Sequence, residues 1–209
     1  PDFFFIERDE PEEILSVIKQ VVSHRLPRRF GVDPVDDIQL LTPMHRGLLG
    51  AQNLNAELQK LLNPRGAVIT RGGRTFRVGD KVMQVRNNYD LEVFNGDLGR
   101  ISAVDEADRQ VRVQVDGREI IYEQADLDEL VLGYACTIHK SQGSEYPVVV
   151  TPLHTQHYTM LQRNLLYTAI TRGKQVVVLI GSKRAVSLAV RNNRLKQRNS
   201  RLADLLTLK

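Results

Sequence analysis

The chain has 209 residues, which is long enough to bury a hydrophobic core as one domain or as a domain with an insertion. Its formal net charge of +4 makes an acidic polymer a candidate partner, and its single cysteine, Cys136, excludes an internal disulfide and a multi-cysteine zinc site. No apolar run approaches the roughly 20 residues that cross a bilayer, so a soluble cytoplasmic protein without a membrane partner is expected. The chain begins in a strand-like run without Met and reads as a piece of a longer polypeptide.

The first 75 residues have the pattern of an α/β unit. Residues 3–7 predict a short strand, Asp9 is the expected cap of a helix with Pro11 in its first turn, and residues 26–31 and 33–34 predict a loop after that helix. Residues 38–41 predict a buried strand, which gives a β-α-β order with parallel pairing of the two strands. A second helix with a leucine stripe then runs from Gly50 to Asn63.

The pattern changes to short strands between residues 76 and 132. These strands are predicted at 81–86, 99–104, 111–115 and 120–123, and Asp116-Gly117 is the expected two-residue turn between the last two. Short strands joined by tight turns are typical of a small barrel.

The α/β pattern resumes after Gly133. Strands are predicted at 148–151 and 176–180, with a helix through 161–170 between them and a helical region from Ser182 onward. This order favours one α/β domain, made of residues 1–75 and 133–209, with a barrel inserted at 76–132, over two consecutive domains.

A polar loop and a second block that ends in an Arg stand directly before the last two apolar strands. Residues 134–147 read Tyr-Ala-Cys-Thr-Ile-His-Lys-Ser-Gln-Gly-Ser-Glu-Tyr-Pro, and residues 164–173 read Asn-Leu-Leu-Tyr-Thr-Ala-Ile-Thr-Arg-Gly. Loops rich in hydroxyl, His, Lys and Gly groups are how α/β proteins present groups to phosphates and nucleotides. Residues 137–145 resemble motif V, and residues 167–172 resemble motif VI, of superfamily-one helicases in the spelling of RecD-like DNA helicases.

The resemblance extends over nearly the whole chain. Residues 41–50 with Leu54 and Asn55 resemble motif IV of that family, and residues 86–90 with 94–97 resemble its following segment. The resemblance implies a RecA-like second motor domain with an inserted SH3-like β-barrel. It also implies the C-terminal motor half of an ATP-dependent DNA helicase that moves 5′ to 3′ on single-stranded DNA, unwinds duplex junctions and serves DNA repair and recombination.

One sequence feature limits this expectation. The chain has no G-x-x-x-x-G-K-[ST] loop. The phosphate cradle and the Mg²⁺ ligands of the motor are therefore expected on the N-terminal motor domain, which is an implied partner of this chain. This chain holds no predicted metal site and alone should not hydrolyse ATP.

The candidate nucleotide residues come from three of the motif segments. An Arg between a helix and a strand can stabilise charge on a transferring phosphoryl group, so Arg172 is a candidate arginine finger, with a salt-bridged surface Arg as the alternative. Arg46 is the second phosphate candidate, with capping or pairing at its turn as the alternative. By resemblance, Gln142 and Gly143 line the nucleotide cleft between the motor domains, and Glu145 reaches the ribose hydroxyl.

The candidate DNA residues lie in two loops. Hydroxyl, imidazole and ammonium donors in the first loop suit a phosphodiester backbone, although an internally bonded histidine is the alternative for the imidazole. Two amides and an aromatic ring in the second loop offer a face for base stacking, with ordinary turn chemistry as the alternative. These residues are Thr137, His139, Lys140 and Ser141, and Asn87, Asn88 and Tyr89. A C-terminal basic run is expected to be a solvated face, with phosphate contact as the alternative: Arg184, Arg191, Arg194, Lys196, Arg198 and Arg201.

Two other functions stay open at this point. A non-catalytic module that binds single-stranded nucleic acid would explain the charge and the barrel, but it gives no reason for Arg172 and Glu145 to stand in these patterns. A nuclease-helicase subunit or a conjugative relaxase-helicase would share the same motifs and differ in segments outside the chain.

Overall fold

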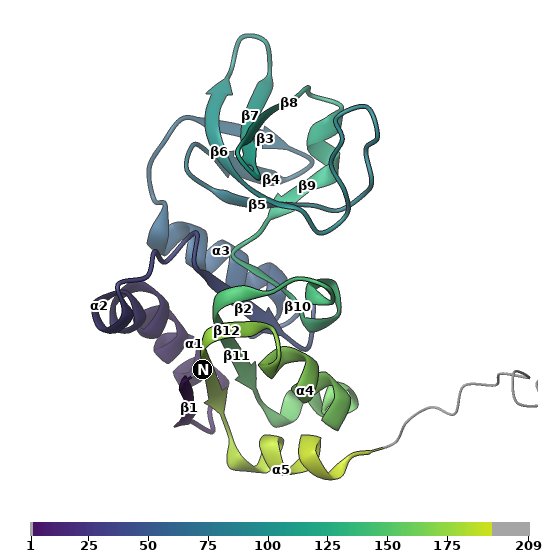
Figure 1. Cartoon of the computed structure of the whole chain (residues 1–209). Coiled ribbons are helices and arrows are strands. Elements are labelled where there is room, and N and C mark those ends of the chain that lie inside the picture. Colours follow the sequence, from purple (N-terminus) through teal and green to yellow (C-terminus); the bar gives the residue numbers. More distant parts are fainter. Residues whose placement is uncertain (1, 194–209) are drawn as a thin grey trace, which may run out of the picture.

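A parallel five-stranded sheet carries the α/β part of the molecule (Figure 1). We describe it from a computed structural model, in which residues 2–193 are described. The sheet has the spatial order β1-β12-β11-β2-β10. Its strands are β1 (Asp2–Glu7), β2 (Ile38–Thr42), β10 (Ala135–Thr137), β11 (Tyr146–Leu153) and β12 (Gly173–Gly181).

Helices cover both faces of this sheet, which is why its central strands are continuous apolar runs. On one face lie α1 (Pro11–Gln20), α2 (Leu26–Phe30) and α3 (Ala51–Leu62), and on the other lie α4 (Arg163–Ile170) and α5 (Lys183–Arg191). Alternate residues of β11 face opposite sides, so Val148 and Val150 pack with the first group of helices and Val149 packs with α4.

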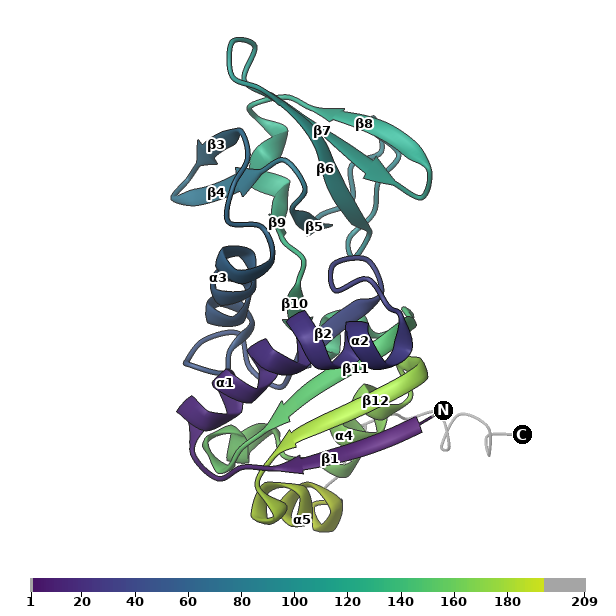
Figure 2. The same cartoon turned by 90° about the vertical axis from the view of Figure 1, so that its left-hand side faces the viewer.

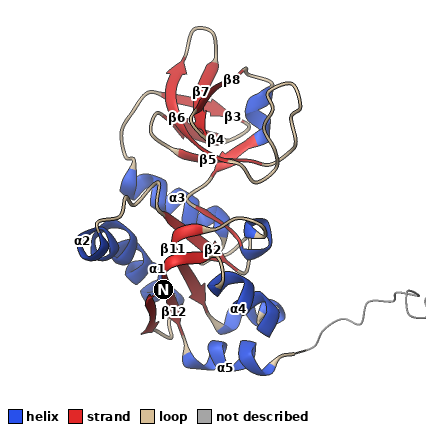
Figure 3. Ribbon diagram, in the orientation of Figure 1, coloured by secondary structure: helices blue, strands red, loops and turns tan. Residues whose placement is uncertain are grey.

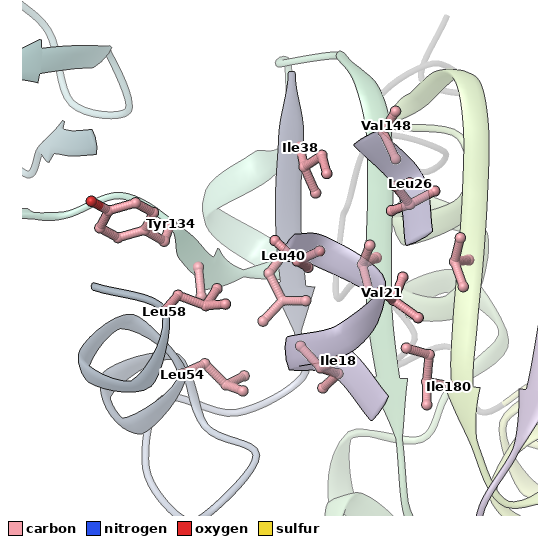
Figure 4. Packing of buried hydrophobic residues seen from close by; sticks show 14 of the residues in the cluster. Ile18, Val21, Leu26, Ile38, Leu40, Leu54, Leu58, Tyr134, Val148 and Ile180 are labelled. Carbon is pink, nitrogen blue, oxygen red and sulfur yellow. The ribbon is translucent and has the colours of Figure 1, made fainter. Parts of the chain in front are cut away.

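The largest core cluster lies between the sheet and the first group of helices (Figure 4). Ile18 of α1 and Leu54 of α3 are fully buried there beside Leu40 of β2. Each such side chain contributes about 1.5–3 kcal/mol through removal from water. This burial holds the helices on the sheet and fixes where the loops at its two edges emerge.

Two predictions for the first 40 residues are wrong. β1 and β2 are parallel but do not pair, because β12 and β11 lie between them. Residues 26–30 are helical, since a π-helix at Val21–Arg25 continues α1 directly into α2. The wider π turn precedes Pro27, which has no N–H to donate to the turn before it, and the helix ends at Gly31 with a φ of 68°.

The N-terminal cap of α1 differs from the prediction. The N-cap of α1 is Glu10 and not Asp9, and no side chain caps this helix. Pro11 opens the helix as predicted, because its missing N–H would have no partner in the first turn. Ser182 caps α5, with its Oγ accepting a hydrogen bond from the backbone N–H of Ala185 at 3.1 Å.

The β-rich part forms the upper body in Figure 3. A hairpin of β3 (Val68–Arg71) and β4 (Arg74–Arg77) precedes an antiparallel sheet of order β8-β7-β6-β5-β9. Its strands are β5 (Lys81–Gln84), β6 (Leu98–Asp105), β7 (Gln110–Val115), β8 (Arg118–Tyr122) and β9 (Leu130–Leu132). Asp116 and Gly117 have φ of 48° and 79°, which confirms the predicted two-residue hairpin turn. The predicted domain boundaries stay predictions, although the first of these strands begins at Val68.

A buried carboxylate joins the two parts of the molecule. Asp80, which is fully buried, accepts hydrogen bonds from Gln59 Nε2 at 2.6 Å, Asn63 Nδ2 at 2.7 Å, the Arg77 N–H at 2.7 Å and Tyr134 Oη at 2.9 Å. Gln59 lies in α3, and Asn63 directly follows that helix. Tyr134 lies between β9 and β10, where the chain returns from the β-rich part to the parallel sheet. The group therefore holds together, beside α3, the two chain segments that enter and leave the β-rich part.

None of the helices within residues 2–193 is long and apolar enough to cross a membrane.

A buried histidine beside α5 gives the fold a pH dependence. Burial, followed by the neighbouring His154, lowers the pKa of His157 to about 4. The unfolded chain then binds a proton near pH 6.5 that the folded chain does not, so stability falls as the pH drops from about 6.5 toward 4. We expect the free energy of unfolding to fall by about 2 kcal/mol from pH 7 to pH 5 through this residue. Urea unfolding should show a smaller fall for His157→Asn, and an equal fall would contradict the assignment.

Candidate functional site

The first candidate group lies at the amino-terminal edge of the parallel sheet. Arg172 directly precedes β12, and the loop of residues 142–145 directly precedes β11. Because β11 and β12 are parallel neighbours with Tyr146 opposite Gly173, the two segments meet. The Tyr146 N–H donates to the Arg172 carbonyl at 2.8 Å, which fixes the contact between them.

The Arg172 side chain is held by neutral acceptors. Its guanidinium group donates to the Ser144 carbonyl at 3.1 Å, the Thr168 carbonyl at 3.3 Å and Thr171 Oγ1 at 3.2 Å. Within residues 2–193, no carboxylate forms an ion pair with it, which does not support the salt-bridged alternative. The side chain is half-buried, so the positive charge is positioned but not neutralised by the chain.

The loop beside Arg172 is open to a ligand. Gly143 has a φ of 88°, a conformation that favours glycine, and nothing lies within 4 Å of the position of a Cβ atom. Gln142 and Glu145 are exposed on either side of it, and the Glu145 carboxylate lies 3.8 Å from Lys174 Nζ. This edge therefore brings together Arg172, Gln142, Gly143 and Glu145, and its cation, open backbone and acceptors fit a nucleotide.

The second candidate group lies at the opposite, carboxyl-terminal edge. Thr137 ends β10 opposite Thr42, the last residue of β2, and the loop after β2 carries Arg46. A cleft of about 600 Å³ opens there between α3, the end of β10 and the β3–β4 hairpin of the barrel. Arg46, Thr137 and Lys140 line it together.

Arg46 and Arg172 are not brought together. The strand register pairs Ile38 of β2 with Val148 of β11, and Val148 with Val176 of β12. Along the strand direction, Thr42 lies four residues after Ile38, and Arg172 lies four residues before Val176. At about 3.3 Å per strand residue, the two levels are roughly 25 Å apart along the strands. In Figure 2, β11 and β12 run from right to left. Arg172 and the strand end that leads into the Arg46 loop therefore lie at opposite edges of the sheet.

The remaining residues of the motif V segment divide into exposed and internal groups. His139 and Lys140 are exposed on the 3₁₀-helix Ile138–Ser141. No hydrogen bond joins the His139 imidazole to another group in the described part of the chain, so the internally bonded alternative gains no support. Ser141 is fully buried and donates to the Ile138 carbonyl at 2.8 Å, which makes it part of the local fold.

The amides of the barrel loop shape that loop. The Asn88 side chain accepts from the Leu91 N–H at 3.1 Å and donates to Glu129 at 3.1 Å, and Asn87 Oδ1 accepts from the Asn95 N–H at 3.0 Å. Tyr89 is 75% exposed. It packs edge-to-face on Phe94, which is 48% exposed, with ring centroids 6.2 Å apart. Sequence reasoning named Tyr89 but not Phe94, although Phe94 stands in the quoted segment 94–97.

The single cysteine and the C-terminal basic run lie outside both candidate groups. Cys136 is buried, and burial raises the pKa of its thiol to about 12. In the C-terminal basic run, Arg184 and Arg191 are exposed on α5. The other four members lie outside the described residues.

Two family models match this chain. Residues 54–115 match the SH3 domain of ATP-dependent RecD-like DNA helicases, and residues 132–180 match the UvrD-like helicase C-terminal domain, which spans both loops at the amino edge of the sheet. The ATP-dependent RecD2 DNA helicase of Deinococcus radiodurans is 42% identical over 168 residues, which are 80% of this chain and 23% of that protein. The chain belongs to the RecD-like superfamily-one helicases.

Other relatives place this RecD-like chain among larger proteins. The RecBCD enzyme subunit RecD of Haemophilus influenzae is 28% identical over 171 residues, which are 82% of this chain and 25% of that subunit. The RecD-like chain thus spans about a quarter of the length of these two relatives. Pif1 helicase from Bacteroides, in a crystal structure with ADP-AlF3 and single-stranded DNA, matches with a TM-score of 0.55 at 18% identity, over 88% of this chain and 51% of that one. This likeness confirms the RecA-like fold, and the family model confirms the SH3 module.

Proposed function

We propose that this RecD-like chain is the C-terminal motor half of an ATP-dependent DNA helicase. The observation that carries the proposal is Arg172, a cation without a carboxylate partner among the described residues, held beside the open Gln142–Glu145 loop. The relative from Deinococcus radiodurans carries the name of an ATP-dependent DNA helicase, which supports the same activity here.

The amino edge is the proposed nucleotide side. ATP with Mg²⁺ supplies the phosphoryl group that is transferred to water, and its cradle and metal ligands belong to a first motor domain. In this chain, Arg172 stabilises negative charge on that phosphoryl group. Gln142 and the exposed backbone at Gly143 contact the nucleotide, and Glu145 accepts a hydrogen bond from the ribose. The half-buried position of Arg172 partly excludes water and strengthens its field.

The carboxyl edge is the proposed DNA side. Thr137, His139 and Lys140 offer donors to the phosphodiester backbone, and Tyr89 offers a ring to a base. The 3₁₀-helix Ile138–Ser141 starts directly after Thr137 and ends directly before Gln142. Residues 138–145 therefore connect the two sides, so a displacement of the Gln142 loop on nucleotide binding moves the DNA donors. This is the proposed coupling of hydrolysis to steps along the strand.

Two relatives leave a second assignment open for the protein that contains this motor half. RecD of Haemophilus influenzae is a subunit of the RecBCD enzyme, and the conjugal transfer protein TraA of Rhizobium radiobacter is 31% identical over 165 residues. The same motor half therefore serves a nuclease-helicase subunit or a relaxase-helicase equally well. The segments that distinguish these proteins lie outside this chain.

The test is made on the full-length helicase that carries this chain. We expect oligo(dT) to stimulate its ATP hydrolysis, and we expect the 209-residue chain alone to hydrolyse none, since the chain has no Walker A loop. On duplexes of equal length, a 5′ single-stranded tail should allow unwinding and a 3′ tail should not. Binding of DNA without hydrolysis or unwinding would support the non-catalytic module. Unwinding from the 3′ tail would overturn the 5′ to 3′ polarity.

A further inference from the structure

We infer that the groove between α5 and the 3₁₀-helix Thr155–Met160 is a docking site for an acidic amphipathic helix of a partner protein. We call it the α5 groove, and its volume is about 630 Å³. Figure 1 shows α5 at the end of the molecule away from the barrel. The α5 groove shares no lining residue with either candidate group among the described residues, so this role goes beyond the proposed motor function.

Exposed apolar side chains line both sides of the α5 groove. Tyr158 of the 3₁₀-helix is 71% exposed, and Leu188 of α5 is 42% exposed. Leu161, which also lines the groove, is buried. A single exposed apolar residue is ordinary, but two large ones on the walls of one groove favour a site for an apolar partner. Docking would remove this surface from water.

Two cations stand on either side of Leu188 along α5. Arg184 and Arg191 lie four residues before it and three residues after it, so the three side chains share one face of the helix. Both arginines are exposed. Within residues 2–193, neither side chain forms a hydrogen bond or an ion pair. Their charges are therefore available to a partner.

The sequence around the α5 groove has one sign of charge. Residues 146–193 contain six Lys and Arg residues and no Asp or Glu. An acidic partner complements this charge, whereas a basic one would be repelled. A helix with an apolar stripe and acidic flanks satisfies both features, because its apolar side chains enter the groove while its carboxylates reach Arg184 and Arg191.

Hydrogen bonds hold the two walls of the α5 groove together. Asn192, at the end of α5, donates from Nδ2 to the Leu161 carbonyl at 2.9 Å. Its own carbonyl accepts from the Arg163 N–H at 3.0 Å. The end of α5 is thus tied to the segment that follows the 3₁₀-helix. A groove that is already formed reduces the entropy lost when a partner binds.

The lining of the α5 groove favours a protein helix over a nucleic acid. Arg191 is its one charged residue among those described, and its other walls present Tyr158, Leu161 and Leu188. A phosphodiester backbone gains most of its affinity from several cations in contact with its phosphates. An amphipathic helix instead gains affinity from apolar side chains in the groove, with charge pairs at the rim.

The experiment measures anisotropy of a fluorescein-labelled peptide with the full-length helicase. The probe is a helix of about 18 residues with leucines at every third or fourth position and glutamates between them. We expect Leu188→Asp to weaken binding about tenfold or more. The double variant Arg184→Glu, Arg191→Glu should weaken binding about tenfold and make it less sensitive to salt. Val190→Asp places the same acid at a 46% exposed position of α5 that does not line the groove, so this matched control should bind as the wild type does.

Four results would overturn the inference. The first is no binding of the peptide, or equal binding of a version with lysines in place of the glutamates. The second is wild-type affinity in Leu188→Asp. The third is displacement of the peptide by oligo(dT) together with weaker oligo(dT) binding by the double arginine variant, which would show a nucleic-acid surface. The fourth is peptide binding only after deletion of residues 194–209, which would make that segment the occupant.

DNA-stimulated ATP hydrolysis separates this inference from the proposed function. Leu188→Asp should hydrolyse ATP at the wild-type rate, because Leu188 belongs to neither candidate group. Absence of hydrolysis in the wild type would overturn the proposed function and leave the peptide result to be read on its own.

Discussion

Replacing Arg172 by alanine in the full-length helicase is expected to lower DNA-stimulated ATP hydrolysis by about 10³-fold or more while ATP still binds. The guanidinium group is held by the Ser144 and Thr168 carbonyls and the Thr171 hydroxyl, all neutral, so its charge remains available for the phosphoryl group. An arginine placed in this way acts mainly on the transition state, and its loss therefore reduces turnover more than ATP affinity. Steady-state turnover and the affinity for a fluorescent ATP analogue measure the two quantities.

Two control variants distinguish a catalytic role of Arg172 from a general effect of removing a charge nearby. Arg172→Lys keeps the charge but loses the planar fork of donors, so its turnover should stay well below that of the wild type. Lys174→Ala removes a neighbouring exposed cation that lies 3.8 Å from Glu145, and its turnover should be close to the wild-type value. If Arg172→Ala turns over ATP at the wild-type rate and remains folded by circular dichroism, Arg172 is not the phosphate-sensing residue.

Replacing Asp80 by alanine is expected to lower the free energy of unfolding by about 3–5 kcal/mol. The carboxylate is fully buried and accepts from four donors, among them the Tyr134 hydroxyl at 2.9 Å. Burial raises the pKa of Tyr134, so its hydroxyl stays protonated and donates throughout the neutral range. Without Asp80 the Arg77 N–H and the Tyr134 hydroxyl lose this acceptor, while the Gln59 and Asn63 amides keep their bonds to the Thr75 and Val78 carbonyls. Urea unfolding measures the loss.

Asp128→Ala is the matched control for the barrel. Its carboxylate pairs with Arg71 at 3.0 Å on the surface, where solvent screens the interaction, so unfolding should change much less than for Asp80→Ala. Equal destabilisation by the two substitutions would mean that the junction at Asp80 contributes no more than a surface ion pair.

The sequence predicted the centre of the fold well because local signals decide it. The apolar runs at 148–150 and 176–180 belong to strands buried on both faces, and Asp116-Gly117 forms a turn that only a few residue pairs allow. The partner of β1 could not be predicted in the same way, because strand neighbours in a parallel sheet are set by packing of distant segments. Pro27 was misread as a break because a π turn before it is not visible in the sequence.

The candidate site was predicted in part. The loops that end at Glu145 and Arg172 meet because each precedes one of two neighbouring parallel strands. Arg46 follows a strand, so once the sheet is known to be parallel it must lie at the other edge; that signal was present in the sequence. The inward direction of Ser141 and the structural use of Asn88 depend on hydrogen bonds that residue types alone do not specify.

The most direct test of the account is a structure of the full-length helicase bound to ADP with an aluminium fluoride and to oligo(dT). We expect the aluminium fluoride within hydrogen-bonding distance of Arg172, at the amino edge of the sheet, and DNA phosphates beside Thr137 and Lys140 at the carboxyl edge. A nucleotide bound beside Thr137, or DNA that crosses the edge of Arg172, would contradict the assignment of the two edges.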